Sequence, residues 1–178
     1  MHTMSEVAAF MHGEMVRNAS GPVAAEIVKA NIADAHVHAL TTWKAWVGNR
    51  RPWDHKPFLK KTYGEWTADI PGLHEYNFDL WSNMHYGYVG TRVGFSGTLL
   101  RSGAGIAQRA AGTSPAGYLS RVWDSGGSFL GALDDPQDQA AIQVGIGLWT
   151  TKGFGLALDD VTEAVRAAAP SLNTRRIA

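Results

Sequence analysis

The chain has 178 residues, no cysteine, and sixteen basic residues against sixteen acidic ones, so its formal net charge is zero. With 45% hydrophobic and 18% charged residues, the composition excludes an intrinsically disordered chain, and the lack of cysteine excludes disulfides and thiolate metal sites. No apolar run reaches the roughly 18 residues that a membrane span needs. The neutral charge also disfavours a nucleic-acid-binding protein, whose surface is usually basic.

Helical periodicity begins near the N-terminus. Residues 4–18 are predicted to form a helix with Ser5 as its N-cap. The inward stripe of this helix carries two polar side chains, Glu14 and Asn18, among apolar ones. Periodicity and turn-forming residues predict the following elements in chain order: a helix over 22–47, a polar turn over 49–56, a short helix over 57–63, a hairpin or irregular loop over 64–79, a glycine-interrupted helix over 79–94, a helix over 97–111, a loop over 112–135, and helices over 136–150 and 160–168.

These elements predict one compact, mainly α domain of about five or six helices, with a small β-hairpin or irregular insertion. The chain lacks the βαβ alternation that a parallel sheet requires. We expect residues 1–178 to form a single domain with its core over 5–168, and residues 169–178 to form a flexible tail. The N-terminus lacks a basic start followed by an apolar stretch, so the sequence predicts no signal peptide.

The first candidate catalytic residue is Glu14. A carboxylate on the inward face of a helix is costly unless it is paired or functional. Partial burial raises the pKa of such a group, as a general acid at neutral pH requires. Asn18 lies one turn later on the same face, where it can orient the carboxylate or bind a substrate. The alternative is that this stripe lies at the edge of the domain and Glu14 is solvated.

The turn Pro52-Trp53-Asp54-His55-Lys56 places an acid, an imidazole and an amine in succession. Alternate side chains in a turn point the same way, so Asp54 and Lys56 are predicted to face one site while His55 points elsewhere. Asp54 is a candidate base or nucleophile, and Lys56 a candidate substrate-binding residue. A turn stabilised by an Asp–backbone bond and a salt bridge is the structural alternative.

A third group lies in the segment Asn83-Met84-His85-Tyr86-Gly87. His85 is a candidate catalytic imidazole, and Asn83 and Tyr86 are candidate substrate-binding side chains. Trp53 and Trp81 are candidate stacking platforms for a sugar, although core packing is the more common role of a tryptophan. No metal site and no cofactor are predicted. The acidic run over 134–138 is better explained as a helix cap than as a calcium loop.

Four blocks together resemble a known family: GEMVRNAS (13–20), RPWDHKP (51–57), DLWSNMHYGYVGTRVGF (79–95) and DDPQDQAAIQVGIGLW (134–149). They are similar to the type 44 polymorphic toxin domain over most of residues 8–150. RRPWDHK departs from the glycine-containing turn expected there, which leaves the geometry of the turn open.

The resemblance implies an antibacterial effector domain, delivered into a target cell as part of a larger secreted toxin and paired with an immunity protein. A monomer is expected. When the four blocks are matched with the family, the resemblance implies that these residues are candidate site residues: Glu14, Asn18, Asp54, Lys56, Asn83, His85 and Tyr86. Asp134, Asp135 and Asp138 also match, more as structural residues.

The first functional hypothesis is a hydrolase of the glycan strands of peptidoglycan, similar to a muramidase. Glu14 is the general acid and Asp54 the partner carboxylate, which requires carboxyl groups about 5–9.5 Å apart. Asn83, His85 and Tyr86 then bind sugar substituents.

The second hypothesis is a metal-independent ribonuclease, with His85 as the base, His55 or Glu14 as the second acid–base group, and Lys56 stabilising the phosphate. The third is a non-enzymatic binding module, in which Glu14 and Asp54 lie on opposite faces.

Overall fold

The computed structural model describes residues 2–101 and 135–177, and these residues are mainly α-helical, which confirms the predicted fold class. They form eight α-helices, two short 3-10 helices and one small antiparallel sheet. In chain order the described elements are α1 (Met4–Ser20), α2 (Pro22–Ile32), α3 (His36–Val47), α4 (Lys56–Tyr63), β1 (Trp66–Asp69), β2 (His74–Asn77), α5 (Asp79–Arg92), α6 (Gly97–Arg101), α10 (Pro136–Lys152), η1 (Gly153–Gly155), α11 (Leu158–Ala168), η2 (Ala169–Ser171) and β3 (Thr174–Arg176).

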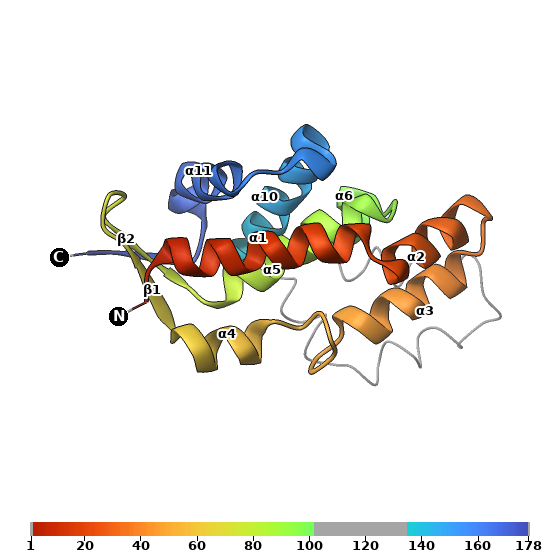
Figure 1. Cartoon of the computed structure of the whole chain (residues 1–178), viewed down its shortest axis with the longest axis horizontal. Coiled ribbons are helices and arrows are strands. Elements are labelled where there is room, and N and C mark those ends of the chain that lie inside the picture. Colours follow the sequence, from red (N-terminus) through yellow and green to blue (C-terminus); the bar gives the residue numbers. More distant parts are fainter. Residues whose placement is uncertain (1, 102–134, 178) are drawn as a thin grey trace.

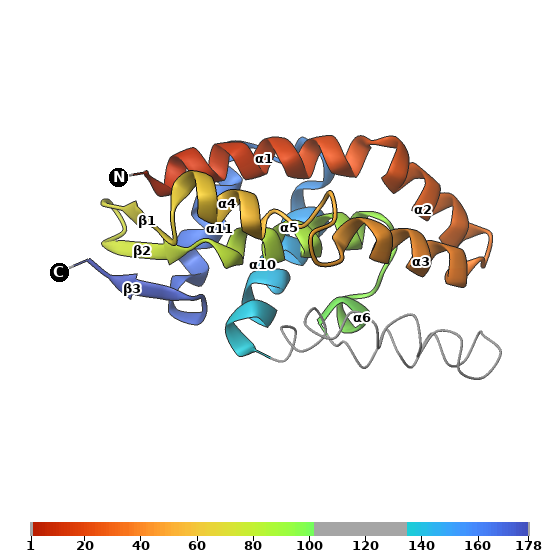
Figure 2. The same ribbon diagram turned by 90° about the horizontal axis from the view of Figure 1, so that it is seen from below.

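Helix α1 runs along the long axis of the molecule, with α2 and α3 at one end and the sheet at the other (Figure 1). Both chain termini lie at the sheet end. Turned by 90°, the molecule shows α5 in the interior, between the outer helices (Figure 2). Helix α5 packs against both α1 and α10. Its residues Leu80–Gly90 are all buried, so this helix is the central element of the fold.

Two glycines allow α5 and α10 to cross at very short range. A Cβ atom on Gly145 would lie 2.7 Å from the backbone nitrogen of Tyr88, and closer still to the carbonyl oxygen of Met84. A Cβ atom on Gly87 would overlap the carbonyl oxygen of Ile142 in the same way. The sequence predicts that the glycines of 79–94 interrupt a helix. Gly87 and Gly90 lie instead inside the continuous helix α5, where Gly87 leaves room for the backbone of α10, and Gly94 follows the end of this helix with a φ of 97°.

The N-terminus of α1 is capped two residues earlier than predicted. Thr3, not Ser5, is the N-cap: its side chain accepts a hydrogen bond from the Glu6 backbone, and the Glu6 carboxylate accepts one from the Thr3 backbone at 2.6 Å. This reciprocal capping box satisfies two of the amide groups that a helix start leaves unpaired. The cap fixes the start of the helix that carries Glu14.

The single helix predicted over 22–47 is two helices, α2 and α3. The break lies at Asp34, which adopts a left-handed backbone conformation with φ of 54°. Aspartate tolerates this region better than most residues, so the chain can turn here without a glycine. The apolar Ile32 makes the sequence pattern look continuous, but its side chain is 79% exposed, so the pattern does not reveal the turn.

The hairpin predicted over 64–79 is present as β1 and β2, and the end of the chain adds a third strand. The strand order is β1-β2-β3, all antiparallel, with Tyr76 of β2 paired to Thr174 of β3. Residues 169–178 were expected to form a flexible tail but instead carry η2 and β3. Arg166 of α11 binds the buried Asp69 carboxylate with two hydrogen bonds of 2.8 Å, which joins α11 to the sheet.

Two predicted segments lie partly or wholly outside the described residues. Of the helix predicted over 97–111, the structure describes α6 alone, and the loop predicted over 112–135 is described only at Asp135. The helix predicted over 136–150 is α10, and Asp135 is its N-cap, accepting a hydrogen bond of 2.8 Å from the backbone of Gln137. In the part of the chain that the structure describes, none of the helices combines the length and apolar character of a membrane span.

The close crossing of α5 and α10 predicts opposite outcomes for two glycine substitutions in the same helix. Gly145→Ala forces the two backbones apart and should destabilise the protein by about 2–4 kcal/mol, since overpacking and lost contacts add. Gly147→Ala, where an added Cβ meets nothing within 4 Å, should stabilise the helix by about 0.5–1 kcal/mol. Urea unfolding followed by circular dichroism measures both. Equal effects of the two substitutions would contradict the crossing.

Candidate functional site

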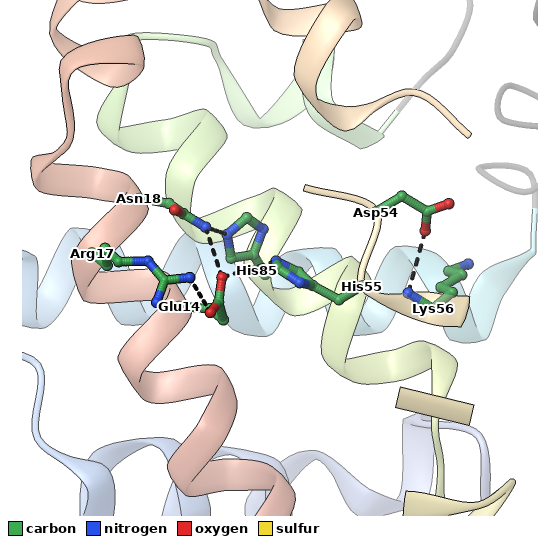
Figure 3. Close-up of polar contacts among 7 residues, drawn as sticks. All are labelled: Glu14, Arg17, Asn18, Asp54, His55, Lys56 and His85. Atoms are coloured by element: carbon green, nitrogen blue, oxygen red, sulfur yellow. Dashed lines mark hydrogen bonds and ion pairs between the residues drawn. The ribbon is translucent and has the colours of Figure 1, made fainter. Parts of the chain in front are cut away.

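Five polar side chains from three segments meet where α1, α5 and the start of α4 adjoin. They form the Glu14 cluster: Glu14, Arg17, Asn18, His55 and His85 (Figure 3). The spacing of α1 brings the first three together within one turn of helix. His85 comes from the central helix α5, and His55 is the residue at the N-terminus of α4. All but Arg17 are buried, with His85 fully so.

The Glu14 carboxylate is the hub of this cluster. It forms an ion pair with the Arg17 guanidinium, and its Oε2 atom accepts a hydrogen bond of 3.3 Å from the Asn18 amide. The Nε2 atom of His55 lies 3.8 Å from the same oxygen. Glu14 is therefore a paired, buried carboxylate rather than a solvated one, which answers the question left open by the sequence.

Asn18 fixes the protonation pattern of His85. The amide nitrogen of Asn18 lies 2.9 Å from the His85 Nε2 atom, and an amide NH₂ group can only donate. The Nε2 atom must then be the acceptor, so the proton of the neutral imidazole is on Nδ1. One amide nitrogen thus donates both to a carboxylate and to an imidazole, and holds the two in a fixed relation.

Both imidazoles of the cluster are kept neutral by their surroundings. Burial holds the pKa of His85 well below its ordinary value, and His55 and Arg17 add to this effect. Burial also lowers the pKa of His55, with Glu14 and Asp54 acting in the opposite direction. The two rings meet edge to face, with centroids 4.6 Å apart. A neutral imidazole beside a carboxylate is equipped to exchange a proton with a bound substrate.

Asp54 and Lys56 are not brought into the Glu14 cluster. The Asp54 carboxylate accepts hydrogen bonds from the backbone nitrogens of Arg50, at 2.8 Å, and Lys56, at 3.3 Å. Figure 3 shows both side chains turned away from Glu14, while His55 between them points to it. The alternation predicted for this turn holds, but the residue that faces Glu14 is the imidazole and not the acid.

Lys56 lies instead beside a second polar group, the Asp138 cluster, which consists of Lys56, Asp79, Asn83, Asp135 and Asp138. The Asn83 amide donates a hydrogen bond of 2.7 Å to the Asp138 carboxylate. Burial raises the pKa of Asp79 and of Asp138, and the positive charge of Lys56 acts against this rise at both. Asn83 and His85, two residues apart on α5, thus face two different polar clusters.

Three of the predicted substrate-binding residues are part of the hydrophobic core. Trp81 is fully buried, and Trp53 and Tyr86 are nearly so. The Trp43 ring lies 6.0 Å from the Trp53 ring and 5.2 Å from the Tyr86 ring, measured between centroids. Their rings are covered by protein, so a sugar has no open face on which to stack. Packing, the more common role of these residue types, explains them.

Arg17 is not among the site residues predicted from the sequence, and His55 has only a secondary role there, in the ribonuclease hypothesis. A signal for Arg17 was present, because residues three apart on a helix lie side by side, as Glu14 and Arg17 do. His55 had a weaker signal, since turn geometry decides which of three adjacent polar side chains faces inward. That geometry depends on tertiary packing.

The two neutral imidazoles predict that stability falls in acid. Below about pH 6.5 the unfolded chain binds protons that the folded chain does not, so the free energy of unfolding should decrease as the pH falls through this range. His85→Gln keeps an acceptor for Asn18 and should reduce this slope by up to about 1.4 kcal/mol per pH unit. Urea unfolding at pH 5, 6 and 7 measures it. His38→Gln, at an exposed imidazole, is the control, and an unchanged slope in His85→Gln would contradict the prediction.

The Asp138 cluster predicts the opposite dependence. Since burial raises the pKa of Asp138, the folded chain holds a proton that the unfolded chain has lost, and stability decreases as the pH rises through that window. Asp138→Asn removes the charge but keeps an acceptor for Asn83. The variant should melt at a higher temperature than the wild type at pH 7 and lose this advantage near pH 3. Thermal melts at the two pH values check it. A variant less stable at pH 7 would show that Lys56 outweighs burial.

Within the ranges that the structure describes, no group of three or more His, Asp or Glu side chains is arranged to hold a metal ion. A family model described as bacterial toxin 44 matches residues 42–151. Neither a curated protein nor a solved structure matches the chain. The matched range contains His55, His85 and all of the Asp138 cluster, whereas Glu14, Arg17 and Asn18 precede it.

Proposed function

We propose that this chain, which belongs to the bacterial toxin 44 family, cleaves RNA without a metal ion and uses Glu14 and His55 as its proton-transfer pair. Family membership gives the chain a toxin or effector role, fits delivery into a target cell and suggests a cognate immunity protein. The chemistry and the substrate are our proposal. The observation that supports them is the composition of the Glu14 cluster: one carboxylate, two imidazoles and one guanidinium.

This set of groups fits the cleavage of a phosphodiester by the neighbouring 2′-hydroxyl. That reaction needs a base for the hydroxyl proton, an acid for the departing 5′-oxygen and a cation for the charged phosphorus centre. In the proposal the Glu14 carboxylate takes the proton and His55 supplies one, once the bound phosphate has favoured its charged form. The products are a 2′,3′-cyclic phosphate and a 5′-hydroxyl, and no water is consumed.

Arg17 supplies the cation. Its side chain is 70% exposed, whereas that of its partner Glu14 is only 9% exposed. A phosphate that approaches from solvent meets the guanidinium first, and arginine binds phosphate with a planar set of donors. Movement of Arg17 from the carboxylate to the phosphate frees Glu14 to act as a base. Asn18, itself bonded to His85, holds Glu14 in place.

Cleavage of peptidoglycan by Glu14 is the second candidate, supported by the burial of a helix-borne carboxylate. It needs a second carboxylate across the scissile bond. Asp54, the partner predicted from the sequence, instead caps its own turn and points away from Glu14 (Figure 3). A non-enzymatic module is disfavoured too, because caps and turns do not require a carboxylate and two imidazoles to be buried together.

The proposal is tested with purified wild-type protein and three variants, each incubated with total RNA and, separately, with isolated peptidoglycan. Glu14→Gln and His55→Ala should each lose about 10²–10⁴-fold in the rate of RNA cleavage, the usual contribution of a general acid or base. Asp54→Asn, which keeps one of the two acceptor oxygens of the turn, is the matched control and should stay within a few-fold of wild type. Mass spectrometry should find 2′,3′-cyclic phosphate ends.

Other outcomes would overturn the proposal in distinct ways. Release of muropeptides that both Glu14→Gln and Asp54→Asn abolish would establish the glycosidase. Wild-type protein that cleaves neither polymer would favour the binding module.

A further inference from the structure

A pair of aromatic rings lies directly beside the Glu14 cluster: the exposed Phe58 and the half-buried Phe10. Phe10 is on α1, one turn before Glu14, and Phe58 is on α4, three residues after His55. Their centroids are 4.8 Å apart and their planes are tilted by 32°. The two helices that present the proton-transfer pair therefore also bring these rings together.

The Phe10–Phe58 pair continues into the cluster. The Phe10 ring meets the His55 ring edge to face, with centroids 6.2 Å apart, and His55 in turn meets His85. Phe58 is at the outer end of this row and is 46% exposed, while the aromatic rings at the inner end are buried. Phe58 thus presents exposed aromatic surface at the edge of a polar, buried cluster.

Positive side chains lie on both helices of this pair. The segment Lys56–Tyr63 contains three lysines and no acidic residue, although Lys56 belongs to the Asp138 cluster and Lys60 pairs with Glu65 at 3.5 Å. On α1 the exposed Arg17 follows Glu14 by three residues, while Phe10 precedes Glu14 by four. Along α1, a cation that suits a phosphate and an aromatic ring that suits a base therefore flank the carboxylate.

We propose that Phe58, supported by Phe10, is the stacking platform for the nucleobase next to the scissile phosphate. The inference rests on the proposed function and names the form of substrate: single-stranded RNA, whose unpaired bases have a free face. Phenylalanine has no hydrogen-bonding group, so the platform accepts any base and the enzyme shows little preference at this position. Base stacking on aromatic side chains is the common mode of sequence-tolerant single-strand binding.

The test measures binding apart from cleavage. A fluorescent 2′-O-methyl RNA oligonucleotide of about twelve nucleotides lacks the attacking hydroxyl, so wild-type protein binds it without cleaving it. By fluorescence anisotropy, Phe58→Ala should weaken binding about 5- to 20-fold, at the lower end of what one stacked base contributes. Phe58→Trp should bind at least as tightly as wild type. Phe154→Ala removes another exposed phenylalanine and is the matched control, expected to leave the affinity unchanged.

A second arm identifies the ligand group. A set of oligonucleotides is used, each lacking the base at a different position. Wild-type protein should bind one of these oligonucleotides more weakly than the intact strand and the others equally well. Phe58→Ala should bind that oligonucleotide and the intact strand with the same affinity, because the missing base and the missing ring belong to one interaction. With cleavable RNA, Phe58→Ala should raise KM with little change in kcat.

The outcomes separate the two proposals. If the wild type cleaves RNA but Phe58→Ala binds and cleaves as well as wild type, the platform is wrong and the proposed function stands. If the wild type neither binds nor cleaves RNA, the proposed function itself fails. Binding of peptidoglycan that Phe58→Ala abolishes would assign the platform to a sugar instead.

Discussion

The rest of the structure depends on the close crossing of α5 and α10, which Gly87 and Gly145 make possible. At this point backbone lies against backbone, so the two helices have little freedom to slide or rotate. The crossing fixes the rotation of α5 about its own axis. That rotation decides that His85 faces α1 and Asn83 faces α10, and it thereby separates the two polar clusters. A small change here would alter both clusters at once, although neither glycine carries any chemistry.

Much of the helical framework is readable in the sequence, because it follows from local rules. Asp135 is the N-cap of α10, as the capping preferences of aspartate predict. The β1–β2 hairpin lies within residues 64–79, where turn-forming residues predict it. Glu14 and Asn18 share a helix face by spacing alone. The break at Asp34 escapes the same rules, because the apolar Ile32 before it suggests a continuing inward face although its side chain is 79% exposed.

The site is less predictable than the helices, for two physical reasons. The side chains of Asp54, His55 and Lys56 are adjacent, and only the packing of α4 against α5 selects which one faces Glu14. The tryptophans are ambiguous for another reason: the same ring serves a core or a ligand. Trp53 packs against the nearby Trp43 and Trp46 and against His85, which is distant in sequence, and no local pattern predicts that burial. Residues 13–20 and 79–95 nevertheless contain two sides of the Glu14 cluster, so the blocks noticed in the sequence do meet in space.

The Glu14 cluster is divided between two stretches of chain that meet at Gly21, an extended residue between α1 and the proline that opens α2. Glu14, Arg17 and Asn18 precede this junction, whereas His55 and His85 follow it. On the proposed chemistry, each stretch alone contains half of a proton-transfer pair and is harmless to the cell that makes it. If the chain were cut at this junction, the two pieces would have to reassociate through the buried apolar face of α1 before the pair could form again.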